Sequence, residues 1–256
     1  MFKIKGVLLI LTLFILSSCE EKIEHEFPTE KRYWDTKDYH SAILELRYGY
    51  KQDEKLPTLD DPTTRLIVEK LTDQQNFKVV LDDTELGGKH RNEIGQDFFE
   101  EYRGMSQIYT ARDRKDNYLY DIEMLAVEQF GLALQLRYFK LGNDQVKEQA
   151  DDPNSSSVKN TVNKNINVLI GNYLLYLDEI NNEDAFSTTG KDKLAKGIDT
   201  YFTLLINTYP DANLKRIKNK AELMLKKSES NSIKKSLEDI INLIDSKQTK
   251  DQPENH

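Results

Sequence analysis

The chain has a single cysteine, Cys19, among 256 residues. A disulfide within the chain needs two thiols, and structural zinc sites usually draw on several cysteines and histidines. The four histidines, His25, His40, His90 and His256, include no His-Glu-x-x-His spacing. The sequence therefore predicts neither a disulfide framework nor a zinc centre, and no residue is assigned to a metal or a cofactor.

Long apolar runs are also missing. The most apolar stretch, Gly6–Leu16, covers about 11 residues, whereas a helix needs roughly 20 to cross a bilayer. Lys3 and Lys5 precede this stretch and the small residues Ser17 and Ser18 follow it. A basic start, a short apolar run and small residues at a cleavage point are typical of a secretion signal rather than a membrane span.

Motifs for phosphate binding and nucleophilic catalysis are incomplete. Gly87-Gly88-Lys89 resembles the end of a phosphate-binding loop, but Asp83 and His90 stand where the pattern needs glycine and Ser or Thr. We therefore interpret the glycines as a helix stop. No Gly-x-Ser-x-Gly elbow occurs. The sequence assigns no catalytic residue, and we expect a protein that is not an enzyme.

Positive charge is in deficit, since 36 Lys and Arg face 44 Asp and Glu and the net charge is −8. Proteins that follow a phosphate backbone usually present a basic face. The balance argues against nucleic acid as a partner. It also disfavours electrostatic binding to anionic lipid, so that any membrane attachment has to come from a lipid anchor.

The residues Leu16-Ser17-Ser18-Cys19 resemble the lipobox of bacterial lipoproteins. The resemblance implies cleavage before Cys19, lipid on Cys19, and a place in the cell envelope, above all at the outer membrane, on its periplasmic face or at the cell surface. A plain secretion signal with a chance cysteine is the alternative. We expect a signal peptide over 1–18 and a lipidated, flexible tether over 19–36, which is charged and interrupted by Pro28.

From residue 37 to 246 the apolar pattern is helical, and strand signals are scarce. We predict an all-α domain of about eight helices, either an irregular bundle or an array of helical hairpins, with a disordered tail over 247–256. The loop composition of 151–157 marks a candidate boundary between two halves.

Particular residues predict the ends of these helices. Asp61-Pro62 opens a helix with a capping aspartate and proline at the first position, and Thr72 caps its continuation to Leu81. A third helix is expected over 92–112, and a fourth begins near Leu119 and stops at Gly142-Asn143. The remaining expected helices are centred on Val162–Ile180, Leu194–Tyr209, Leu214–Leu225 and Ile233–Ile244.

Two short segments resemble helical lipoprotein families. Tyr33–Ala42 is similar to the start of the first helix in SusD-like nutrient-binding lipoproteins. Tyr201–Asp211 resembles the end of a tetratricopeptide unit. A second copy at a period near 34 residues is not found, so a regular repeat array is not expected.

Carboxylates gather in four places, and each is interpreted first as a solvated helix face. Arg112–Asn117 is a charged loop between two apolar segments, where binding residues often occur. The clusters are Asp82-Asp83, Glu100-Glu101, Asp113 with Asp116, and Asp178-Glu179 with Glu183-Asp184.

These observations favour an envelope lipoprotein whose helical domain binds a protein partner, for example an immunity protein that neutralises a secreted toxin. A nutrient- or glycan-binding accessory protein is the first alternative, and Trp34 and tyrosines facing solvent in a groove would support it. A carboxylate-dependent enzyme acting on envelope polymers is the second. Two acids facing each other across a concave pocket would support that reading.

Overall fold

The computed structural model describes residues 28–53, 58–110 and 119–248. Within these ranges the chain is all-α and contains no strand, which confirms the predicted fold class. The signal peptide, Cys19 and the Arg112–Asn117 loop lie outside the described residues.

The N-terminal half begins with four helices, and their starts follow from local chemistry. Asp61 Oδ2 accepts a hydrogen bond from the Thr64 backbone N–H at 2.6 Å, with Pro62 as the first helical residue, which confirms the predicted cap. The helices are α1 (Thr36–Asp53), α2 (Pro62–Leu71), α3 (Gln75–Leu81) and α4 (Gly88–Thr110).

Two predicted helix boundaries in this half are wrong. Thr72 ends α2 instead of capping a continuation, because its hydroxyl donates back to the Val68 carbonyl at 2.7 Å. Gly88 begins α4, whereas the Gly87-Gly88 pair was expected to close a helix. Glycine provides backbone freedom at either end of a helix, so this pair does not distinguish a start from a stop.

The long central helix α5 (Asp121–Glu148) also differs from its predicted length, since it continues past Gly142-Asn143. Asn143 is buried within α5, where its Oδ1 accepts from Asn165 Nδ2 at 2.8 Å and its Nδ2 donates to the Tyr209 hydroxyl at 3.2 Å. These hydrogen bonds satisfy the amide of Asn143, a residue type that without such partners favours a turn. Half of the residues of α5 are buried, as the position of this helix in the core requires.

The C-terminal half contains α6 (Ser156–Asp178), the 3-10 turns η2 (Glu179–Ala185), α7 (Thr188–Gly197), the π-helical turn η3 (Ile198–Phe202), α8 (Thr203–Thr208), α9 (Lys215–Lys227) and α10 (Asn231–Gln248). The run from α7 to α8 is one nearly continuous helix, interrupted only by η3.

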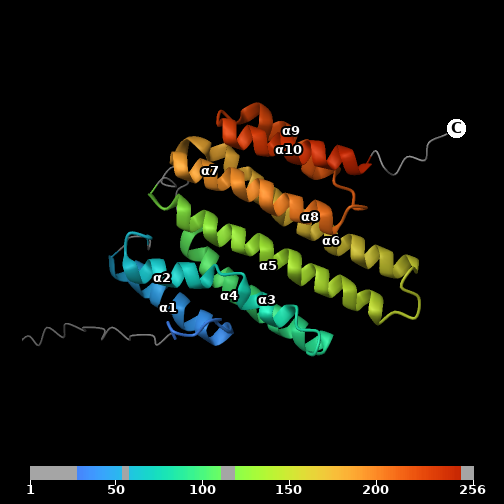
Figure 1. The fold of residues 1–256 in the computed structure, drawn as a ribbon, viewed down its shortest axis with the longest axis horizontal. Helices are drawn as coiled ribbons and strands as arrows, with labels where there is room; N and C mark the ends of the chain where they lie inside the picture. The colour runs from blue at the N-terminus through green and yellow to red at the C-terminus, as the bar shows by residue number, and fades with distance from the viewer. Residues whose placement is uncertain (1–27, 54–57, 111–118, 249–256) are drawn as a thin grey trace, which may run out of the picture.

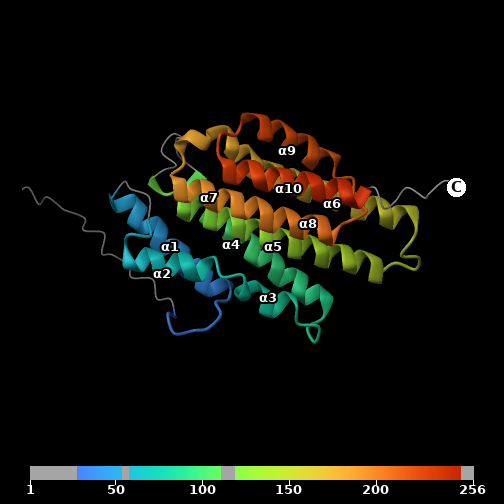
Figure 2. The same cartoon turned by 45° about the horizontal axis from the view of Figure 1, so that its top comes forward.

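Helix α5 lies in the middle of the molecule (Figure 1), with α1 to α4 on one side and α6 to α10 on the other. It packs against α4 and α6, and these three run roughly alongside one another in both views (Figures 1 and 2). The buried apolar residues form one cluster that reaches from Trp34 to Ile244. Three neighbouring helices, α4, α5 and α6, position the site described next.

Candidate functional site

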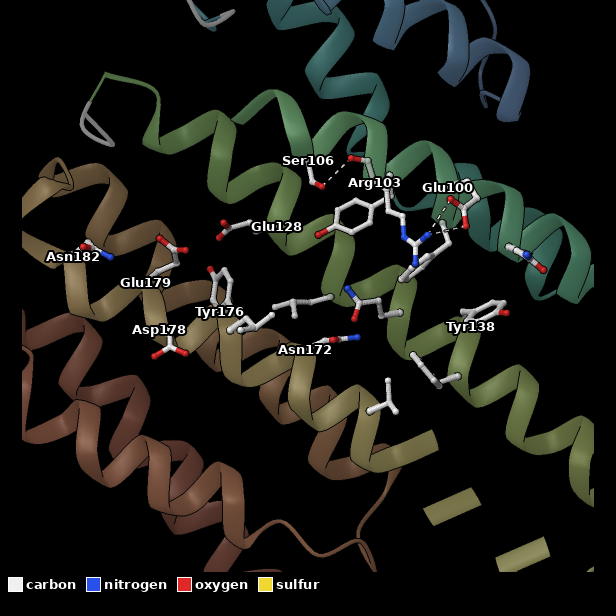
Figure 3. A pocket seen from close by; sticks show the side chains of 18 residues that line it. Glu100, Arg103, Ser106, Glu128, Tyr138, Asn172, Tyr176, Asp178, Glu179 and Asn182 are labelled. Atoms are coloured by element: carbon white, nitrogen blue, oxygen red, sulfur yellow. Dashed lines mark hydrogen bonds and ion pairs between the residues drawn. The ribbon is translucent and has the colours of Figure 1, made fainter. Parts of the chain in front are cut away.

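A groove of about 860 Å³ lies between α4 and α6, with α5 as its floor (Figure 3). Helix α4 contributes Gln96, Phe99, Glu100, Tyr102, Arg103 and Ser106. Helix α5 contributes Glu128, Leu132, Gln135, Tyr138 and Phe139. The opposite wall, from α6 and η2, contains Val168, Asn172, Leu175, Tyr176, Asp178, Glu179 and Asn182.

Helical periodicity explains why these residues share one surface. The α5 residues between Glu128 and Phe139 and the α6 residues between Val168 and Glu179 recur at three- and four-residue steps, which places each set on one face of its helix. At a rise of 1.5 Å per residue, either stripe is roughly 16 Å long. The groove is therefore an elongated channel parallel to the helices.

One wall of the groove is aromatic and charged. The rings of Phe99 and Tyr138 are stacked with their centroids 6.0 Å apart and an interplanar angle of 29°. The guanidinium of Arg103 lies 5.3 Å from the centroid of Phe99, and its Nη1 donates to both carboxylate oxygens of Glu100 at 3.1 and 3.2 Å. The guanidinium of Arg103 thus contacts both a carboxylate and an aromatic ring on this wall.

Tyr102 lies over the groove floor because α5 has glycine below it. A Cβ at Gly131 would be 2.2 Å from Tyr102 Cζ, which is closer than atoms approach. Burial raises the pKa of the Tyr102 hydroxyl, and the nearby charge of Glu128 raises it further. The hydroxyl therefore stays protonated at neutral pH, and it forms no hydrogen bond with the residues that the structure describes.

Tyr176 closes the floor at the η2 end, near Glu128 and Glu179 (Figure 3). Its hydroxyl accepts from Gln129 Nε2 at 2.8 Å and donates to the Leu194 carbonyl at 3.4 Å. Burial, the largest cause, raises the pKa of this hydroxyl well above its ordinary value. Tyr176 is thus a neutral structural support whose hydroxyl already has partners.

The amide of Gln135 is the groove's most unusual polar group. Gln135 is 7% exposed, and its Oε1 is shielded from solvent without a hydrogen-bond partner in the described part of the chain. Leaving a buried acceptor unsatisfied costs about 1–3 kcal/mol. Asn172 contributes a second amide from the facing helix. A buried polar atom without a partner is rare in folded proteins and calls for a physical explanation.

The rim formed by α6 is apolar and faces solvent. Leu175 is 65% exposed and Val168 is 49% exposed, and both line the groove. Single exposed apolar residues are ordinary on protein surfaces. Here two of them stand seven residues apart on the same face of one helix, beside a hollow, which is the arrangement of a binding surface.

The acidic clusters proposed from sequence are engaged within the molecule. Asp82 pairs with Arg137, Asp178 pairs with Lys220, and Glu101 lies 3.3 Å from His40 Nδ1. Glu183 Oε1 accepts from the backbone N–H of Ser230 at 2.7 Å, just before α10 begins. Asp113 and Asp116 lie outside the described residues. Asp82 is exposed, in agreement with a solvated helix face, whereas Glu179 and Glu183 are only 5% and 6% exposed, so that interpretation is wrong for these two.

Glu128 and Glu179 both line the groove, and sequence reasoning missed the first of them. Glu128 from α5 and Glu179 from η2 both lie close enough to Tyr176 to influence its pKa. Glu179 belongs to a cluster noted in the sequence, whereas Glu128 is an isolated acid in an apolar helix. Neither carboxylate is without a partner in the chain.

Trp34 and the tyrosines of the central helices divide between core and groove. Trp34 is 1% exposed, and its Nε1 donates to the Pro28 carbonyl at 3.0 Å. Tyr109 and Tyr120 are also buried, whereas Tyr102 and Tyr138 line the groove and Tyr118 lies outside the described residues. Burial of Trp34 argues against a glycan platform at the beginning of α1.

In residues 28–53, 58–110 and 119–248, no group of three His, Cys, Asp or Glu side chains is placed to hold a metal ion. No helix among them is both long enough and apolar enough to cross a membrane.

Comparison of the chain with models of protein families, with characterised proteins and with solved structures found no match. The lipobox, SusD-like and tetratricopeptide resemblances therefore stay predictions from the sequence.

Proposed function

We propose that this chain is a non-enzymatic lipoprotein of the cell envelope, most simply of the outer membrane, whose helical domain binds a protein partner in the groove between α4 and α6. The lipobox ending at Cys19 supports the location. The groove supports the binding role, because it combines an exposed aliphatic rim with the Gln135 amide, whose Oε1 has no partner among the described residues.

The observation that carries the proposal is the exposure of Leu175 and Val168 beside this groove. Aliphatic side chains of a partner gain free energy by covering such a rim, at about 25 cal/mol per Å² of apolar surface. Sugars gain less there, since they stack on aromatic faces. The aromatic pair Phe99 and Tyr138 is a surface on which a sugar can stack, and it favours the glycan-binding alternative. The burial of Trp34 counts against that alternative.

The carboxylate-dependent enzyme is the other alternative under test, and Glu128 and Glu179 in one groove are the residues it would use. Both have partners within the chain, which favours a structural role for them. Replacing both by Gln would abolish hydrolysis of an envelope polymer if this alternative holds.

A toxin is one form that the partner can take. A tethered domain that covers the active site of an incoming toxin needs binding surface and no catalytic group. Co-expression of the chain with a candidate toxin from a neighbouring gene tests this form, with cell survival as the readout.

Photo-crosslinking in living cells tests the proposed function. A photoreactive amino acid replaces Leu175 on the groove rim or, as a matched control, Leu223, which is 48% exposed on α9 and outside the groove. We expect a discrete protein adduct from position 175 and none from 223. Equal amounts of adduct at positions 175 and 223 would contradict the proposal. The absence of an adduct at 175, together with groove-dependent binding on an oligosaccharide array, would also contradict it.

A further inference from the structure

We infer that the groove holds a segment of the partner in extended conformation, and that the Gln135 amide pairs with the backbone of that segment. The inference rests on the proposed function and specifies how the partner is recognised. Its starting point is a polar side chain that is 7% exposed, lines the groove and leaves its Oε1 without a partner among the described residues.

An amide side chain matches a peptide backbone because each has one N–H face and one carbonyl face. A half-turn about the last torsion of Gln135 exchanges Oε1 and Nε2, so either atom can face the ligand. An extended strand leaves half of its N–H and C=O groups directed to each side and free to pair. Asn172 on the opposite wall offers a second amide of the same kind.

A helical segment fits this floor less well. The backbone of a helix is satisfied internally, so only its side chains reach the groove, and helices bound in grooves lay down an apolar face. An apolar face would cover the Gln135 amide without pairing it. The amide atom that faces the groove would then lose its contact with water and gain no partner, whereas an extended chain supplies one.

The dimensions and the rim agree with an extended segment. A channel of roughly 16 Å holds about five residues at 3.3 Å per residue. Alternate side chains of a strand point to opposite faces, so one set can contact Leu175 and Val168 while the other faces solvent. The expected segment is therefore about five residues long, with aliphatic side chains at every second position.

Selection and backbone methylation together test the inference. Random heptapeptides displayed on phage are selected on the intact chain held in detergent micelles. Enriched peptides are then synthesised with a single backbone N-methyl group at each position in turn, and the Kd is measured by fluorescence anisotropy. We expect one or two N-methyl positions to weaken binding about tenfold, since each removes a hydrogen bond donor.

The decisive comparison repeats the scan on the Gln135→Leu variant. If the Gln135 amide pairs with the peptide backbone, Gln135→Leu raises the Kd of the parent peptide several-fold. N-methylation at one position then no longer weakens binding to this variant. Leu175→Glu is expected to weaken the same peptide at least tenfold, and Leu223→Glu leaves it unchanged. Thermal melts confirm that the variants are folded. Because residue 175 is exposed, Leu175→Glu keeps the test available if Gln135→Leu does not fold.

Three results would overturn the inference. They are N-methyl penalties that persist unchanged in Gln135→Leu, bound peptides with a helical circular dichroism spectrum, and no enriched heptapeptide at all. If position 175 still crosslinks to a protein in cells, any of these results leaves the proposed function standing and removes only the extended mode of binding. Loss of that adduct as well would refute both the proposed function and the extended mode of binding.

Discussion

At the scale of single residues, the two glycines of α5 have opposite roles. Gly131 makes room for the ring of Tyr102, whereas a Cβ at Gly142 would meet nothing within 4 Å. A Gly→Ala substitution at each position therefore separates the effect of packing on stability from the effect of helix propensity.

Gly131→Ala is expected to destabilise the fold by about 1–3 kcal/mol, because the Tyr102 ring has to leave its place. Gly142→Ala is expected to stabilise it by about 0.5–1 kcal/mol, through the better helix propensity of alanine. Urea unfolding of both variants measures the difference. Equal effects in the two variants would show that Tyr102 does not rest on Gly131.

A second residue-scale prediction concerns Glu123, which is largely buried and whose carboxylate accepts a hydrogen bond from the Leu59 backbone N–H. Burial raises the pKa of Glu123 above its ordinary value of 4.5, and the bond from Leu59 opposes this. The folded state then holds the proton more tightly than the unfolded state. This contribution to stability is full below pH 4.5 and is lost as the pH rises through the folded-state pKa.

Glu123→Gln keeps an acceptor for Leu59 and removes the titration. We expect the stability of the variant relative to wild type to grow as the pH rises above 4.5, measured by thermal unfolding between pH 4 and 8. A constant difference across this range would show that burial does not raise the pKa of this group.

At the scale of elements, side chains from other segments of the chain allow α5 to continue past a local stop signal. Asn143 shows this most clearly, since Gly142-Asn143 is a typical stop and α5 passes through it. Asn165 of α6 and Tyr209 beyond α8 provide the hydrogen bonds that Asn143 would otherwise seek in a turn. A boundary of this kind depends on partners 22 and 66 residues away in the chain.

Asn143→Ala is therefore expected to cost about 1–3 kcal/mol, because it removes the hydrogen bonds of Asn143 to the partly buried Asn165 and Tyr209. Combining it with Asn165→Ala is expected to cost less than the sum of the two single changes, since both remove the same bond. Chemical unfolding of the double-mutant cycle measures this coupling. Additive costs would mean that the Asn143–Asn165 bond contributes nothing.

At the scale of the whole molecule, the proposed anchor and the groove are separable. Cys19→Ser is expected to abolish incorporation of labelled palmitate and to remove the chain from the outer-membrane fraction, because buried acyl chains contribute about 0.8 kcal/mol per CH2. Leu175→Glu, in contrast, is expected to incorporate palmitate as the wild type does and to lose binding of the partner. Unchanged labelling of Cys19→Ser would refute the proposed attachment.

The amino-acid sequence by itself determined that the chain is helical and where much of the core lies. Tyr39, Ile43 and Leu46 recur at helical spacing and are all buried, and Asp61 caps α2 as predicted. These properties are local, since they depend on residues within one or two turns of each other.

Only the tertiary structure decided which of the predicted helix ends are correct and where the groove lies. Gln135, Val168 and Leu175 carry no motif, and nothing in their sequence neighbourhood separates them from ordinary helix residues. They become a site because α4 and α6 pack on opposite sides of α5 and leave their facing stripes uncovered. The physical reason is that helix propensity is set by near neighbours, whereas a groove is set by the packing of residues far apart in the chain.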